Sequence, residues 1–179
     1  MNWKWGGLMN KTYVYYCEGE DDQKLIDALK VSPSKIQPGK SKKLNVIQSL
    51  IPKSILLGIK SDTNVVLVFD TDVTTNLDVV KKNIENIKKY CRGVKIINLL
   101  QVKNLEDELV RCTDVKTVLE LTKSKSLSNF KADFRKMKDE QCRSMLDRHK
   151  IDVKRLWTTR ASGEFEFAER NSELVIKSV

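Results

Sequence analysis

The chain has 179 residues, of which 40% are hydrophobic and 32% are charged, as expected for one soluble globular domain with a core of its own. No apolar run approaches the roughly 20 residues that a membrane helix needs, and the N-terminus lacks the apolar core of a secretory signal, which argues against membrane insertion and export. The excess of 33 Lys+Arg over 24 Asp+Glu gives a net charge of +9, which favours polyanionic partners such as nucleic acid.

The first third of the chain predicts a strand, a helix and a loop in that order. Residues 11–17 (KTYVYYC) read as a strand, and residues 20–30 (EDDQKLIDALK) read as a helix that begins with acidic residues, as the helix dipole favours. Residues 31–43 contain two of the three prolines and predict a loop with a short strand at 35–37. Residues 44–59 have a helical pattern that Pro52 should interrupt.

The middle of the chain continues the alternation of strands and helices. We expect strands at 64–70 and 94–102, with a helix at 77–93 between them and a basic, helical region at 109–160 after them. Strands that alternate with helices predict an α/β fold, in which helices flank a parallel sheet. The helical region should then form a C-terminal extension.

Acidic residues follow three of the predicted strands. Glu18 follows the first strand, Asp70 and Asp72 close the run VVLVFDTD, and Glu106 and Glu108 lie in VKNLEDEL after the last strand. The carboxyl ends of parallel strands meet at one edge of a sheet, where ligands of α/β proteins bind. Clustered carboxylates repel one another unless a cation neutralises them, and Mg²⁺ prefers oxygen ligands of this kind. The sequence therefore predicts a divalent-metal site.

These motifs resemble the Toprim domain, which topoisomerases, bacterial primases, M5-type maturation ribonucleases and OLD-type nucleases share. The resemblance rests on Glu18-Gly19 followed by Asp22, on the Asp70/Asp72 pair that ends an apolar strand, and on a later acidic cluster. It implies a Toprim-like catalytic core at 9–110 and a mainly helical cap or tail at 111–179. The segment DTDVTTN lacks the glycine that many members have after the aspartate pair, which favours a freestanding nuclease over a primase or topoisomerase.

The resemblance also implies roles for these residues. Glu18, Asp70 and Asp72 would be catalytic, holding Mg²⁺ or Mn²⁺ and carrying the acid–base chemistry of phosphodiester cleavage. Either Glu106 or Glu108 would complete the metal site, and the sequence does not choose between them. Asp22 has two readings of equal weight, a metal ligand or a partner of the helix dipole.

Two basic segments have competing interpretations. Four basic residues of the helical region suit phosphate contacts, although a solvated helix face explains them equally well; they are Lys123, Lys125, Lys131 and Arg135. Gly39-Lys40-Ser41 resembles the end of a P-loop, but the first glycine of that motif is missing, so we do not expect it to bind nucleotide.

The leading hypothesis is a magnesium-dependent cytoplasmic nuclease that hydrolyses DNA or RNA. Such a nuclease could serve as the effector of an antiviral (anti-phage) defence system. The main alternative is a non-catalytic Toprim-fold subunit that works with a partner ATPase in trans, since the chain has no complete P-loop of its own. A phosphatase or nucleotidyl transferase with the same metals is a third reading. A homo-oligomer is compatible with all three, and a membrane partner is not expected.

Overall fold

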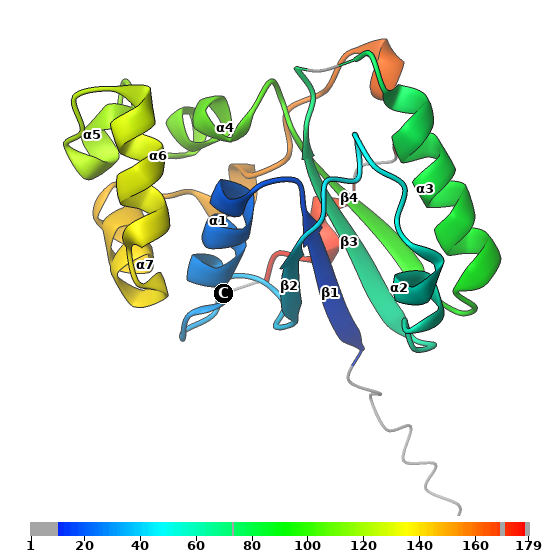
Figure 1. The fold of residues 1–179 in the computed structure, drawn as a ribbon. Coiled ribbons are helices and arrows are strands. Elements are labelled where there is room, and N and C mark those ends of the chain that lie inside the picture. Colours follow the sequence, from blue (N-terminus) through cyan, green and yellow to red (C-terminus); the bar gives the residue numbers. More distant parts are fainter. Residues whose placement is uncertain (1–10, 73, 169–170, 178–179) are drawn as a thin grey trace, which may run out of the picture.

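A four-stranded, all-parallel sheet forms the centre of the computed structural model, which describes residues 11–72, 74–168 and 171–177 (Figure 1). The strand order is β2-β1-β3-β4. The strands are β1 (Thr12–Cys17), β2 (Lys40–Lys43), β3 (Thr63–Asp70) and β4 (Lys95–Gln101). The predicted fold class, a parallel α/β sheet flanked by helices with a helical C-terminal region, is confirmed.

From β1 the chain first adds β2 on one side, and it later adds β3 and β4 on the other side of β1. Helix α1 (Glu20–Lys30) carries the chain from β1 to β2, whereas α3 (Leu77–Tyr90) carries it from β3 to β4 on the opposite face (Figure 1). The topological switch point therefore lies between β1 and β3. In open α/β sheets, the crevice at the carboxyl ends of the strands beside this point is where ligands bind.

Both faces of β3 are buried, which explains its unbroken apolar run. Val66 and Val68 belong to the core cluster on the α1 side, and Val65, Leu67 and Phe69 belong to the cluster beneath α3. Successive side chains of a strand point to opposite faces, so only a strand covered on both sides can be apolar throughout.

The C-terminal helices form an outer layer beside α1, which α6 and α7 contact directly (Figure 1). They are α4 (Leu105–Cys112), α5 (Val118–Thr122), α6 (Leu127–Lys136) and α7 (Asp139–Arg148), followed by short 3-10 turns at Val153–Arg155, Gly163–Phe165 and Ser172–Leu174. Phe130, Phe134 and Trp157 share one core cluster with Tyr15 of β1, so this layer packs on the sheet domain directly. Within the described ranges, no helix is long and apolar enough to span a membrane.

Three sequence predictions need correction. The predicted strand at 35–37 is an isolated bridge between Ile36 and Ile176, and the real strand is β2, inside the predicted loop. Only α2 (Lys53–Leu57) is helical within residues 44–59, because the Asn45 side chain accepts hydrogen bonds from the backbone of Ile47 and Gln48 and forms a turn instead. The helical region begins at Leu105 and its last α-helix ends at Arg148 rather than spanning 109–160.

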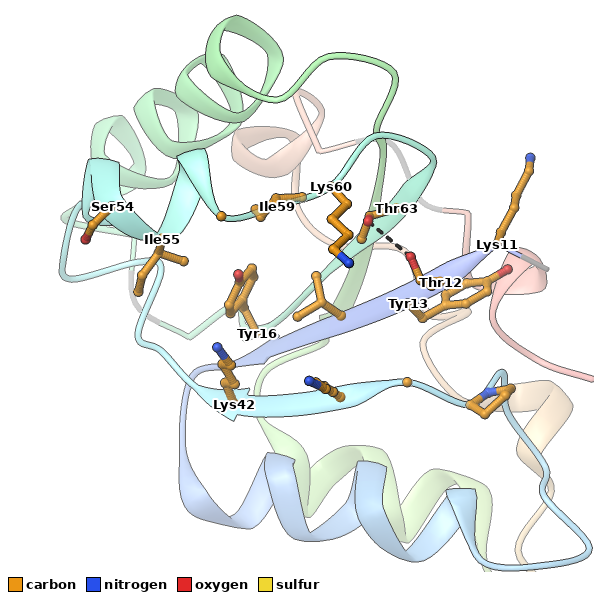
Figure 2. Close-up of a pocket in the computed structure, with 15 residues that line it drawn as sticks. Lys11, Thr12, Tyr13, Tyr16, Lys42, Ser54, Ile55, Ile59, Lys60 and Thr63 are labelled. Atoms are coloured by element: carbon orange, nitrogen blue, oxygen red, sulfur yellow. Dashed lines mark hydrogen bonds between the residues drawn. The ribbon is translucent and has the colours of Figure 1, made fainter. Parts of the chain in front are cut away.

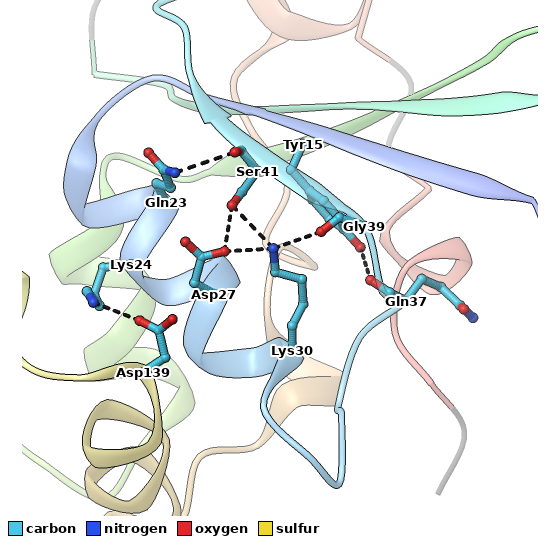
Figure 3. A network of polar contacts seen from close by, with 9 residues as sticks. All are labelled: Tyr15, Gln23, Lys24, Asp27, Lys30, Gln37, Gly39, Ser41 and Asp139. Carbon is cyan, nitrogen blue, oxygen red and sulfur yellow. Dashed lines mark hydrogen bonds and ion pairs between the residues drawn. The ribbon is translucent and has the colours of Figure 1, made fainter. Parts of the chain in front are cut away.

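Strand β2 (KSKK) has no apolar residue, and polar contacts to α1 hold it in place (Figure 3). Ser41 Oγ donates to Asp27 Oδ1 at 2.5 Å, and Lys30 Nζ lies 2.6 Å from the same carboxylate oxygen. Lys30 also donates to the Gly39 carbonyl at 2.9 Å. A strand fixed by side-chain contacts from a neighbouring helix carries no apolar pattern of its own, which is why the sequence did not reveal it.

Candidate functional site

Acidic side chains meet at the carboxyl edge of the sheet, beside the switch point. Glu18 directly follows β1 and Asp70 ends β3, and these two strands are neighbours. Gln101 ends β4 and pairs in register with Asp70. Asp22 of α1 and Glu106 of α4 lie close enough for their negative charges to raise the pKa of Asp70.

Glu18 reaches across from β1 to the end of β3. Its backbone N–H donates to the Val68 carbonyl at 3.0 Å, which continues the strand pairing by one residue. Its carboxylate Oε2 accepts the Asp70 backbone N–H at 3.1 Å. Burial is the main cause that raises the pKa of Glu18, and the nearby charges of Asp22 and Asp72 raise it further.

Asp70 lies next to several negative charges. Its Oδ1 atom is buried and has no hydrogen-bond partner among the described residues. Burial raises the pKa of Asp70 to about 9, and the negative charges of Asp22, Glu18, Asp72 and Glu106 contribute in that order. An ionised carboxylate here is unfavourable unless a positive charge joins it.

Asp22 caps its own helix. Its Oδ2 atom accepts the Gly19 backbone N–H at 2.7 Å, at the N-terminus of α1. Asp22 thus has a capping role at the helix terminus, and its roles toward the helix dipole and toward a metal stay predictions. Burial raises the pKa of Asp22, and the nearby Gln101 amide opposes this shift. The amide does not reach full hydrogen-bond geometry, so Gln101 Nε2 and Oε1 are both buried without a hydrogen-bond partner among the described residues.

The structure separates the two later acidic candidates. Both lie in the first turn of α4, not in a strand or an open turn, and residues two apart on a helix point in nearly opposite directions. The charge of Glu106 raises the pKa values of Asp70 and Asp22. The fully buried Glu108 instead accepts the Trp157 backbone N–H at 2.6 Å and pairs with Arg111 at 2.5 Å. Glu106 is therefore the one that belongs to the acidic edge.

The predicted phosphate-binding residues divide in the same way. Lys131 Nζ lies 2.9 Å from Glu106 Oε1, and its pKa is raised chiefly by this hydrogen bond, with a smaller contribution from Asp70. Arg135, one turn further along α6, makes two 2.7 Å hydrogen bonds to Asp21. Lys123 and Lys125 are exposed in the connection between α5 and α6. Lys131 thus pairs with the acidic edge, Arg135 pairs with the neighbouring Asp21, and the other two face solvent.

Asp72 lies on the loop that leaves β3 and is exposed. The loop is held at Thr71, whose backbone N–H is shared between the carbonyls of Gln101 at 3.1 Å and Lys103 at 2.9 Å. The charge of Asp72 contributes to the raised pKa values of Glu18 and Asp70. Asp72 is thus the solvent-facing member of the acidic group.

The donor set suits a hard cation, although its carboxylates are turned to other partners. Among the described residues, no three His, Cys, Asp or Glu side chains are arranged as a ready metal shell. Glu18 and Asp22 accept backbone N–H groups, and Glu106 is paired with Lys131. Asp70 retains a buried oxygen without a partner, and an orphaned carboxylate oxygen amid negative charge is what a divalent ion would satisfy.

Sequence reasoning missed one member of this site, Gln101, and named a second, Lys131, without linking it to the acidic residues. Gln101 is fully buried at the end of β4, and a polar residue that ends an apolar strand (NLLQ) was the available signal. Lys131 was one of several lysines in a basic helix, and no sequence feature distinguished it, because its contact with Glu106 depends on how α6 packs.

Comparison with models of known protein families, with curated proteins and with solved structures returned no match.

Proposed function

We propose that the protein is a divalent-metal-dependent nuclease that hydrolyses phosphodiester bonds in DNA or RNA in the cytoplasm. The observation that carries the proposal is the Asp70 carboxylate, whose buried Oδ1 atom has no hydrogen-bond partner among the described residues and whose pKa is raised by burial and by four neighbouring acidic groups. Burial of such a group costs stability, so its presence at the switch point indicates a functional constraint. The net charge of +9 favours a polyanionic substrate despite the acidic edge.

Glu18, Asp70 and Asp72 would hold the ion, with Glu106 as the further ligand. When bound, Mg²⁺ or Mn²⁺ supplies charge neutralisation and Lewis-acid polarisation of a phosphate. If Glu106 turns both carboxylate oxygens to the ion, it gives up the 2.9 Å pair that its Oε1 atom makes with Lys131. The freed ammonium group would then lie at the edge where negative charge develops on a phosphate during cleavage.

The metal site is tested by thermal unfolding and by cleavage assays with the same samples. We expect Mn²⁺ to raise the melting temperature of the wild type and to support cleavage of DNA or RNA. Glu18→Gln should lose both effects while remaining folded. A wild type that shows neither a metal-dependent shift nor cleavage of any nucleic acid would contradict the proposal. Metal binding without hydrolysis would instead favour the non-catalytic subunit that works with a partner ATPase.

Lys131→Met should reduce the cleavage rate about 100-fold, in the range found when one donor to a developing negative charge is removed. The Mn²⁺-induced thermal shift should persist or increase, because Glu106 no longer has a competing partner. Lys136→Met is the matched control, since Lys136 is an exposed lysine of the same helix. Equal losses in the two variants would show that Lys131 contributes only general positive charge.

A further inference from the structure

A groove opens on the sheet face opposite α1, away from the acidic edge (Figure 2). It has a volume of about 830 Å³ and lies over β1 and β2, between these strands and the segment from α2 to β3. Helix α2 has only five residues, so this part of the face lacks the cover that α3 gives to β3. We call it the basic groove and define it by Val14, Lys42, Ile55, Ile59 and Lys60.

The floor of the basic groove is apolar. Val14, Ile55 and Ile59 are half-buried and pack against the core cluster beneath α3, next to the buried ring of Tyr16. The volume of the groove, about 830 Å³, falls within the roughly 300–1,000 Å³ typical of small-molecule sites. This floor therefore suits the apolar part of a small molecule.

The rim of the groove is basic because β2 alternates its side chains. Ser41 and Lys43 point toward α1, where they bind Asp27 and Glu20. Lys40 and Lys42 lie on the other side of the strand and line the groove. The two faces of β2 thus differ, with one saturated by acidic partners and the other free of them.

Lys60 joins these two lysines from the far wall. In Figure 2, Lys42 and Lys60 extend into the same space from β2 and from the α2–β3 connection. Within the described part of the chain, Lys40, Lys42 and Lys60 form no ion pair, and no acidic residue lines the groove. Like charges that converge without a counter-charge repel one another, and an anion would relieve this repulsion.

We propose that the basic groove binds a small amphipathic anion, namely a carboxylate or phosphate ester attached to an apolar body. The apolar part lies on Val14, Ile55 and Ile59, and the anionic group lies between Lys42 and Lys60. A bare inorganic anion leaves the apolar floor exposed, and a neutral apolar molecule leaves the lysines uncompensated. The site is independent of the acidic edge and goes beyond the proposed nuclease function.

The P-loop-like triplet Gly39-Lys40-Ser41 takes part in a different way from a nucleotide-binding loop. It leads into an edge strand and not into a helix, and Ser41 Oγ is engaged by Asp27. Gly39 is required for close packing, because a Cβ atom there would lie 2.4 Å from the Tyr13 carbonyl oxygen. The glycine therefore brings β2 against β1, and the lysine that follows faces the groove.

The proposal is tested with 1-anilinonaphthalene-8-sulfonate, an aromatic anion that fluoresces when it is buried, and with decyl phosphate as a competitor. We expect decyl phosphate to displace the dye from the folded wild type. The double variant Lys42→Gln/Lys60→Gln should bind decyl phosphate at least tenfold more weakly. Lys88→Gln, which removes an exposed lysine of α3, should bind it as the wild type does. All three proteins should have the same melting temperature because these lysines are exposed.

Several results would overturn the proposal. Decanol that competes as well as decyl phosphate would remove the role of the lysines, and inorganic phosphate that competes equally well would remove the role of the floor. Displacement by an oligonucleotide at equal phosphate concentration would assign the groove to nucleic acid. Dye release that accompanies a doubling of mass at higher protein concentration would assign it to a second copy of the chain.

Discussion

Asp70→Asn is expected to abolish nuclease activity and, in metal-free buffer, to make the protein more stable than the wild type. Cleavage should fall roughly a thousandfold, which corresponds to about 4 kcal/mol of lost transition-state stabilisation. Stability should rise because asparagine removes an ionisable group whose Oδ1 atom is buried without a partner among the described residues. A residue whose loss stabilises the fold while destroying activity serves function at the expense of stability.

The stability gain should depend on pH in a defined direction. Burial raises the pKa of Asp70 to about 9 in the folded protein, against about 3.9 in an unfolded chain. Between these values the folded state holds a proton that the unfolded state has released, so the free energy of unfolding decreases as the pH rises. Asparagine has no such proton, and the advantage of the variant should therefore grow from near zero at pH 4 toward pH 9.

Thermal melts of both proteins across this range measure the effect, at roughly 2–4 °C per kcal/mol for a domain of this size. Glu18 and Asp22 also have raised pKa values, so the difference between the two proteins at each pH, and not the wild-type curve alone, isolates Asp70. Saturating Mn²⁺ should reverse the order at high pH by stabilising only the wild type. A variant that melts below the wild type at every pH without metal would show that Asp70 supports the fold.

The parts of the fold that sequence could predict are those with local signals. The apolar run at Val65–Phe69 marked a strand buried on both faces, and residues 20–30 marked α1 to the residue. The positions of Glu18 and Asp70 at strand ends also predicted that they lie close together, because the carboxyl ends of parallel strands share one edge of the sheet. Each of these inferences needed only short-range periodicity and a general rule of sheets.

The parts that could not be predicted depend on contacts between distant segments. Strand β2 is held by Asp27 and Lys30 of α1, and its own four residues carry no apolar pattern. The pairing of Lys131 with Glu106 depends on how α6 packs against α1 and α5. A difference of one turn in the position of that helix would have placed another residue there, and sequence periodicity does not fix such offsets.

The choice between Glu106 and Glu108 leads to the second large prediction. Glu108 is fully buried and binds Arg111 and the Trp157 backbone N–H, so Glu108→Gln breaks a buried charge pair. We expect a loss of about 2–3 kcal/mol, below the usual range for such pairs because the Arg111 side chain keeps 31% of its exposure. The melting temperature should fall by about 5–10 °C, with cleavage retained in the fraction that remains folded.

Glu106→Gln, two residues away on the same helix, is the matched variant with the opposite pattern. It removes only a partly exposed pair with Lys131, so stability should change by less than about 1 kcal/mol. It also removes a negative charge that acts on Asp70 and the proposed further metal ligand, so the Mn²⁺-induced thermal shift and cleavage should both decrease. If Glu108→Gln instead lost metal binding at unchanged stability, the roles of the two residues would be reversed. Helix α4 then would have to rotate about its axis to bring Glu108 to the acidic edge.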